Sequence, residues 1–163
     1  MYRVLIADDE SIIREGIKCL FDWESLAYTI AGEAANGDSA YQQILSLHPD
    51  IVLLDIRMPG MSGLDVIREA RAQGFTGKVI ILSGYSDFKY AQEAIRYGVQ
   101  YYLTKPIDED ELEEILCSIK ETLDKDTATA NTREHYREKA RETIIRDLLT
   151  NEIDLSHINT ADL

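Results

Sequence analysis

The sequence has few residues that could cross-link the chain or bind zinc, and it lacks a long apolar run. Its 163 residues include two cysteines and three histidines. No apolar run approaches the ~20 residues of a membrane-spanning helix. Cys19 and Cys117 lie far apart and lack the paired spacing of a zinc site, so we expect free, buried thiols on helices in a reducing cytoplasm. The N-terminus, where acids soon follow a short apolar run, does not resemble a signal peptide. These absences predict a cytoplasmic protein without a membrane segment.

Basic residues are scarce as well. The chain has 17 Lys and Arg against 30 Asp and Glu, which gives a net charge of −13. Residues 108–163 hold 16 acids and 7 bases, whereas residues 1–107 hold 14 acids and 10 bases. Such a chain repels phosphate backbones, so we expect that it binds no nucleic acid itself. With 45% hydrophobic residues it is long enough for one well-buried domain and a modest extension.

The stretch on which the rest of the chain depends is centred on Asp55. Residues 51–54 are branched and apolar, with Pro49 before them and Pro59 shortly after. A continuous apolar run predicts a strand that is covered on both faces. In open α/β sheets the ligand crevice lies outside the carboxyl ends of the strands, where Asp55 stands. A helix cap is the simpler explanation for an aspartate, but the next expected helix begins only near Ser62.

Apolar strand patterns alternate with helical patterns five times along the chain. Strands are expected at residues 2–7, 28–34, 51–55, 78–82 and 100–104. Helices are expected from Ser11, from Asn36-Gly37, from Ser62, over 87–97 and from Asp108. This alternation predicts an α/β fold with parallel strands and right-handed crossovers, in three layers.

Two details of this pattern can be checked directly in a structure. Ser11 is expected to cap the first helix, whose buried face is predicted from its apolar residues, Ile12, Ile13, Ile17 and Leu20.

The predicted organisation is a domain over residues 1–123, a hinge over 124–132 and a helical tail over 133–163, whose apolar stripe ends near Leu149.

Polar side chains stand at the expected carboxyl ends of four strands. They are Asp8 and Asp9, Asp55, Ser83 and Lys105. Burying three carboxylates together is costly unless positive charge lies among them. A lysine and a divalent cation supply it, and oxygen-only ligands favour Mg²⁺. A carboxylate in such a setting can accept a phosphoryl group. Each residue alone could be a cap, a turn residue or a surface charge, but their joint placement favours a site.

Several motifs at these strand ends resemble one family. They are Asp8-Asp9-Glu10, the segment 53–63 (LLDIRMPGMSG), Ser83-Gly84 and Lys105-Pro106. In this order and at this spacing they resemble the receiver domain of bacterial two-component response regulators, over residues 1 to about 123. The resemblance implies a (βα)5 doubly wound parallel sheet of five strands in the flavodoxin-like order 2-1-3-4-5.

The resemblance also implies a role for each matching residue. Asp55 would accept a phosphoryl group from a sensor histidine kinase, and self-phosphorylation and autodephosphorylation would be the only catalysis. The Mg²⁺ ligands would be Asp9, Asp55 and the backbone carbonyl of Arg57, with Asp8 acting through water. Lys105 would bind the phosphoryl group, and the Lys105-Pro106 peptide would be cis. Ser83 and Tyr102 would be the switch residues.

Residues 83–91 (SGYSDFKYA) resemble receivers joined to a C-terminal AraC-type DNA-binding module that regulates transcription. That module is missing here, and an acidic tail follows instead, which favours a truncated chain over a natural stand-alone form. A homodimer is also expected, through the face of the fourth helix, fifth strand and fifth helix or through the C-terminal helix. The tail's apolar stripe could equally pack within one chain.

Three other functions fit less well. A Mg²⁺-dependent phosphatase of the haloacid dehalogenase type needs a second acid two residues after its nucleophile, where this chain has Arg57. A pseudo-receiver that only binds proteins should lack a site residue, and none is missing. Nucleotide binding is disfavoured because no glycine-rich loop follows the first strand.

Overall fold

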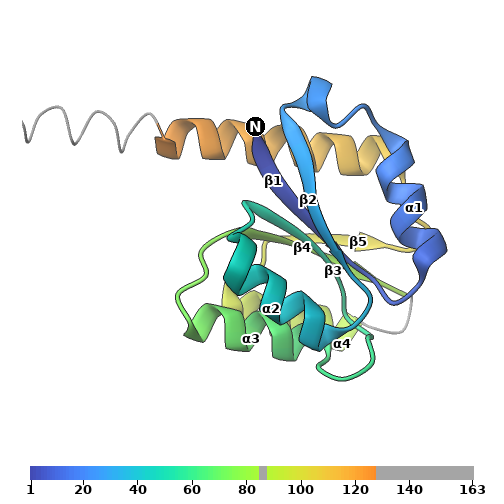
Figure 1. The fold of residues 1–163 in the computed structure, drawn as a ribbon, viewed down its shortest axis with the longest axis vertical. Coiled ribbons are helices and arrows are strands. Elements are labelled where there is room, and N and C mark those ends of the chain that lie inside the picture. The colour runs from blue at the N-terminus through green and yellow to red at the C-terminus, as the bar shows by residue number, and fades with distance from the viewer. Residues whose placement is uncertain (85–87, 128–163) are drawn as a thin grey trace, which may run out of the picture. The chain divides into compact units, whose positions relative to one another are not determined.

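The computed structural model describes residues 1–84 and 88–127, and the side chains of Phe88 and Ala91 are not described. Among these residues five strands form one parallel sheet in the order β2-β1-β3-β4-β5 (Figure 1). The strands are β1 (Tyr2–Ala7), β2 (Tyr28–Ala34), β3 (Ile51–Asp55), β4 (Lys78–Ser83) and β5 (Tyr101–Thr104). The predicted sheet and strand order are confirmed.

Helices connect the strands on both faces of the sheet. They are α1 (Ser11–Leu20), η1 (Glu24–Leu26), α2 (Gly37–Leu47), α3 (Gly63–Ala72), α4 (Phe88–Ala94) and η2 (Ile95–Tyr97), and residues 109–127 are also helical. Figure 1 shows α1 on one side of the sheet and α2, α3 and α4 on the other. The helix predicted over 87–97 is thus divided into α4 and η2, and Asp87 lies outside the described residues.

The core is centred on β3, as predicted. All five residues of β3 are buried, and so are most residues of β1 and β4 on either side. Strands in the middle of a parallel sheet are covered on both faces by the crossover helices, so their sequences are continuously apolar. The outer strands β2 and β5 are less deeply buried.

Several helix boundaries follow from the signals in the sequence. The Asn36 side chain accepts a hydrogen bond from Ser39 N at 2.8 Å and caps α2. Ser62 and Asp65 form a capping box at the start of α3. Gly98 follows η2 in the left-handed conformation, with a φ of 79°.

Three predictions about helices were wrong. Ser11 does not cap α1, because it is the first helical residue and Glu10 stands at the cap position without a side-chain bond. Ile12 is 76% exposed, because the spacing of Ile13 and Ile17 places that face of the helix, and not Ile12, against the sheet. Cys19 and Cys117 are exposed thiols and not buried ones.

The chain divides into two compact units, Met1–Cys117 and Ser118–Leu163. In the second unit the described residues, 118–127, are helical. The predicted hinge over 124–132 therefore begins within helical residues, and its remainder and the predicted tail over 133–163 lie outside the described residues. In the described part of the chain, no helix combines the length and apolar character that crossing a bilayer requires.

Candidate functional site

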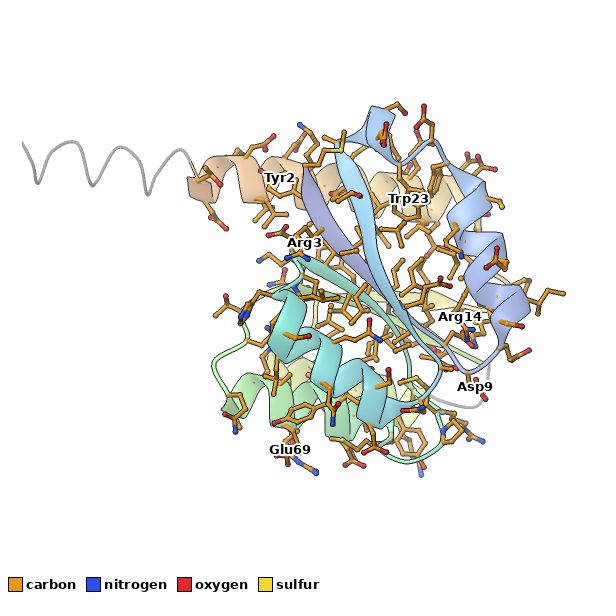
Figure 2. The ribbon with its side chains drawn as sticks, in the orientation of Figure 1. Tyr2, Arg3, Asp9, Arg14, Trp23 and Glu69 are labelled. Carbon is orange, nitrogen blue, oxygen red and sulfur yellow. The ribbon has the colours of Figure 1, made fainter. Side chains whose placement is uncertain are left out.

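The predicted site residues meet at the carboxyl end of the sheet. Asp8 and Asp9 follow β1, Asp55 ends β3, Ser83 ends β4 and Lys105 follows β5. Parallel pairing in register brings these strand ends to one edge, since Asp55 is opposite Leu82 and Ser83 is opposite Thr104. Figure 2 shows Asp9 at this end of the molecule and Arg3, near the start of β1, at the other.

Lys105 connects two buried carboxylates. Its Nζ lies 2.9 Å from Asp8 Oδ2 and 3.1 Å from Asp55 Oδ2. Asp8 is fully buried and Asp55 is 4% exposed, whereas the Lys105 side chain is 19% exposed. The peptide between Lys105 and Pro106 is cis, as predicted. Two buried negative charges thus share one positive charge.

The pKa values of Asp55 and Lys105 show the consequence of this arrangement. Burial raises the pKa of Asp55 from its ordinary 3.8 to about 6, the hydrogen bond from Lys105 opposes the rise, and repulsion from Asp8 adds to it. Burial alone would lower the pKa of Lys105, but its bonds to Asp8 and Asp55 outweigh that effect and raise it. The site therefore has less positive charge than its carboxylates need.

Asp8, Asp9 and Glu10, here called the acidic turn, connect β1 to α1. One carboxylate oxygen from each of the three lies within 4.8 Å of the other two, and Asp55 is not part of that close group. Asp8 Oδ1 accepts a hydrogen bond from Glu10 N at 2.9 Å. Glu10 was not among the predicted metal ligands, although its place directly after two aspartates was a visible signal.

A cavity of about 510 Å³ opens beside the acidic turn. Asp9 and Arg57, two of the predicted metal-binding residues, both line it, together with Ser62 and Tyr90. The backbone N–H of Arg57 donates to Asp55 Oδ1 at 3.2 Å, so the loop that lines this cavity also orients the Asp55 carboxylate. Ser62 and Tyr90 did not feature in the predicted site, because no strand end carries them.

The two predicted switch residues are hydrogen-bonded to each other. Ser83 Oγ donates to Tyr102 Oη at 2.5 Å. Ser83 is fully buried and Tyr102 is half-buried against the core. The backbone N–H of Lys105 donates to the Ser83 carbonyl at 2.8 Å, which ties β4 to the residue that carries the lysine. Ser83, Tyr102 and Lys105 therefore belong to one connected group.

The donor set fits a small, hard divalent cation. Every candidate ligand atom near the acidic turn is oxygen, and the nearby carboxylates outnumber the one lysine between them. Oxygen donors of this kind suit Mg²⁺, which is typically held by one or two carboxylates and keeps several waters.

Comparison with known proteins gives one consistent result. Residues 4–117 match the family described as the response regulator receiver domain. The transcriptional regulatory protein YesN of Bacillus subtilis is 39% identical over 163 residues, covering 96% of this chain and 44% of YesN. HptR of Staphylococcus aureus is 39% identical over 123 residues, covering 76% of this chain and 48% of HptR. The chain thus spans about half the length of these relatives.

Solved structures agree with these sequence matches. The receiver domain of AraT, a response regulator from Geobacillus stearothermophilus, has a TM-score of 0.74 at 40% identity, over 77% of this chain and 98% of that one. A two-component transcriptional regulator AraC from Clostridium phytofermentans has a TM-score of 0.71 at 33% identity, over 78% of this chain and 99% of that one.

Proposed function

This chain belongs to the response regulator receiver domain family, and from that premise we propose that Asp55 accepts a phosphoryl group from a sensor histidine kinase. Phosphorylation then controls a transcription-regulating output, as the names of the relatives suggest. We propose that this event takes place in the cytoplasm, which is consistent with the family match. Apart from self-phosphorylation and autodephosphorylation, the chain catalyses no reaction.

The observation that carries the proposal is the sharing of Lys105 between Asp8 and Asp55. A buried carboxylate that serves only stability is normally paired or fully hydrogen-bonded. Asp55 has a hydrogen bond and an ion pair, yet burial still raises its pKa, and it shares its lysine with a second buried acid. Such an arrangement suits a site that receives further charged groups during its function.

The chemistry follows from these contacts. An Asp55 carboxylate oxygen attacks the phosphorus of a phosphohistidine, the P–N bond breaks, an O–P bond forms, and the departing imidazole takes up a proton. Lys105 neutralises negative charge on the phosphoryl oxygens, and the Ser83 hydroxyl donates a hydrogen bond to one of them. Attack by water on the phosphorus later returns Asp55 and inorganic phosphate. Bound Mg²⁺ supplies further neutralisation of that charge.

The proposed Mg²⁺ ligands are Asp9, Asp55 and the backbone carbonyl of Arg57, with Asp8 acting through water. Support comes from the shared cavity of Asp9 and Arg57. The direct ion pair between Asp8 and Lys105 is compatible with an indirect role for Asp8, because that carboxylate already has a close cationic partner.

A kinase also needs a surface on which to dock near Asp55. An apolar groove of about 190 Å³ runs along α1 and reaches Pro106 and Ile107, so it connects the elements that follow the acidic turn and Lys105. Ile12 lines this groove and is 76% exposed. We assign the groove to the kinase because a donor seated there would be next to both of these site elements.

Replacing Ile12 separates docking from chemistry. Ile12→Lys is expected to reduce phosphotransfer from a histidine kinase at least tenfold while leaving phosphorylation by acetyl phosphate unchanged. Ile95→Lys is the matched control for phosphotransfer alone, because Ile95 is 67% exposed and lies in η2, outside the groove and on the face proposed for the second copy. Equal rates of phosphotransfer from the kinase to the two variants would show that the kinase does not dock in this groove.

The output is proposed to pass through Ser83 and Tyr102. One hydroxyl proton cannot serve Tyr102 and a phosphoryl oxygen at once, so Ser83 must turn toward the phosphoryl group and Tyr102 must repack inward. This changes the face of α4, β5 and the following helix, through which a second copy is proposed to bind. The alternative dimer, through the helix predicted for the C-terminal tail, falls on residues 128–163, which lie outside the described residues.

That face offers a cavity of about 300 Å³ lined by Ile95, Tyr101 and Tyr102, among others. Light scattering with and without beryllofluoride, in wild type and in Tyr102→Ala, tests the coupling. A variant that is phosphorylated normally and keeps the full change in self-association would contradict it.

The experiment that tests the proposed function is phosphorylation with acetyl phosphate and Mg²⁺, followed by intact mass. Wild type should gain one phosphoryl group, and Asp55→Ala should gain none. Asp50→Asn is the matched control, because Asp50 precedes the same strand at its other end, where its side chain accepts a bond from Arg3 N at 2.8 Å. Labelling that survives Asp55→Ala would refute the proposal.

A further inference from the structure

We propose that Arg14 is a positioning residue, which holds the acidic turn in the conformation that binds a divalent cation. This inference rests on the proposed function, since it concerns the metal site beside Asp55. Arg14 stands in α1, and its NH1 group donates to the carbonyl oxygen of Asp8 at 2.6 Å. Figure 2 shows Arg14 and Asp9 at the same end of the molecule.

The bond from Arg14 fixes the direction in which Asp9 leaves the strand. The carbonyl of Asp8 belongs to the peptide group that joins Asp8 to Asp9, so holding this oxygen prevents the peptide plane from rotating. The N–H of Asp8 is held as well, by the Ala34 carbonyl at 3.0 Å. The Asp8 carboxylate is held by Glu10 N and by Lys105. With Asp8 constrained at each of these points, the exposed Asp9 side chain starts from a fixed backbone.

Arg14 is itself anchored to the neighbouring strand. Its Nε forms an ion pair with Glu33 Oε1 in β2 at 3.4 Å, without a hydrogen bond, and the other Glu33 oxygen lies 3.0 Å from Lys18 Nζ. Only 17% of the Arg14 side chain is exposed, so the guanidinium has few alternative positions. This chain of contacts ties α1, β2 and the end of β1 together directly behind the acidic turn.

The charge of Arg14 makes its role testable. A guanidinium beside a cation site repels the cation, so removing the charge alone should tighten Mg²⁺ binding. Removing a group that orients ligands should weaken it, by about 10-fold or more for outer-shell partners of metal sites. The two effects have opposite signs. Weaker binding in a variant without the charge therefore identifies positioning.

The experiment is a Mg²⁺ titration followed by amide chemical shifts, without any phosphodonor. Arg14→Gln is expected to bind Mg²⁺ about 10-fold more weakly than wild type. Arg14→Lys keeps the charge but replaces the planar guanidinium with a single compact ammonium, so it should be at least as weak. Arg71→Gln is the control, because half-buried Arg71 also donates to backbone carbonyls, those of Phe75, Gly77 and Tyr97. It should lower the melting temperature and leave Mg²⁺ affinity unchanged.

The outcomes separate this inference from the proposed function. Arg14→Gln that binds Mg²⁺ as tightly as wild type or more tightly overturns the positioning role, while the proposed function stands. A wild-type chain that binds no Mg²⁺ overturns the proposed function and this inference together. If Arg71→Gln weakens Mg²⁺ binding as much as Arg14→Gln does, the effect is general loss of stability and positioning is refuted.

Discussion

The two ends of the parallel sheet use similar residues in opposite ways. At the amino end, Arg71 Nε and NH1 donate to three backbone carbonyls at 2.8–2.9 Å, and the guanidinium lies over the Phe75 ring. Asp50 there accepts the backbone N–H of Arg3. At the carboxyl end, Asp8 and Asp55 share one lysine. At the amino end these polar groups are hydrogen-bonded to one another. At the carboxyl end two buried carboxylates share one lysine, so a negative charge is left unbalanced. Stability is concentrated at one end and chemistry at the other.

The largest effect is expected for Lys105. Lys105→Gln should slow phosphorylation by acetyl phosphate by about 10²–10³-fold, because one group that stabilises developing charge is lost. Lys78→Gln, at the amino end of β4, removes the same charge and should leave the rate within twofold. Single-turnover rates measured by intact mass give the comparison. Similar rates for both variants would abolish the distinction between the two ends.

The raised pKa of Asp55 predicts how stability depends on pH. A carboxyl with a pKa of about 6 in the folded chain and 3.8 when unfolded binds its proton more tightly when folded. Its contribution to the free energy of unfolding is therefore fully present below pH 3.8 and is lost as the pH rises through about 6. At about 1.36 kcal/mol for each pKa unit, the loss is about 3 kcal/mol.

Urea unfolding in EDTA measures this loss, with Asp55→Asn as the reference. The free energy of unfolding of wild type minus that of Asp55→Asn should fall by up to about 3 kcal/mol between pH 4 and pH 7. A difference that stays constant over this range would mean that the charged form of Asp55 does not destabilise the folded chain.

Arg71 tests the amino end. Arg71→Gln should lower the free energy of unfolding by about 1–3 kcal/mol, because backbone carbonyls lose a buried donor. Burial lowers the pKa of Arg71 but cannot neutralise an arginine, so the loss should not depend on pH between 5 and 8. Phosphorylation by acetyl phosphate should remain within twofold of wild type. A large loss of phosphorylation in a folded variant would contradict the division of roles.

The smallest effect concerns two tyrosine hydroxyls. Tyr102→Phe and Tyr28→Phe each remove one hydrogen bond, to Ser83 Oγ and to the Leu116 carbonyl, at a cost of about 1 kcal/mol. With beryllofluoride bound, the cost of Tyr102→Phe should fall toward zero, because Ser83 then has another acceptor, while the cost of Tyr28→Phe should persist. Equal costs in both states would contradict the proposed switch.

The sequence predicted the sheet well because its signals are local. Continuous apolar runs identified β1, β3 and β4, and Asn36 and Ser62 marked the starts of two helices. The strand order came from the family motifs, because periodicity does not determine which strands are neighbours. The exposure of Ile12 was missed because Ile12 is apolar, like its neighbours in the buried stripe. Its position around the helix axis nevertheless points its side chain away from the sheet.

The site was predicted less completely, for a related reason. The charged residues at strand ends could be collected because parallel strands bring their carboxyl ends together. The contacts of Arg14, Ser62 and Tyr90 depend on how helices and loops pack over that edge. Nothing in the spacing of Arg14 distinguishes it from ordinary surface residues of a helix. Ser62 and Tyr90 lie within the family motifs, but no role at the site was predicted for them.

Asp55 alone is expected to become phosphorylated, and chemical mapping of the phosphorylated residue shows whether it does. After phosphorylation with acetyl phosphate and Mg²⁺, borohydride reduces an acyl phosphate and converts the phosphorylated aspartate to homoserine. Peptide sequencing by mass spectrometry is predicted to find homoserine at position 55 and aspartate at positions 8, 9 and 50. Homoserine at position 8 or 9, with aspartate retained at 55, would contradict the account.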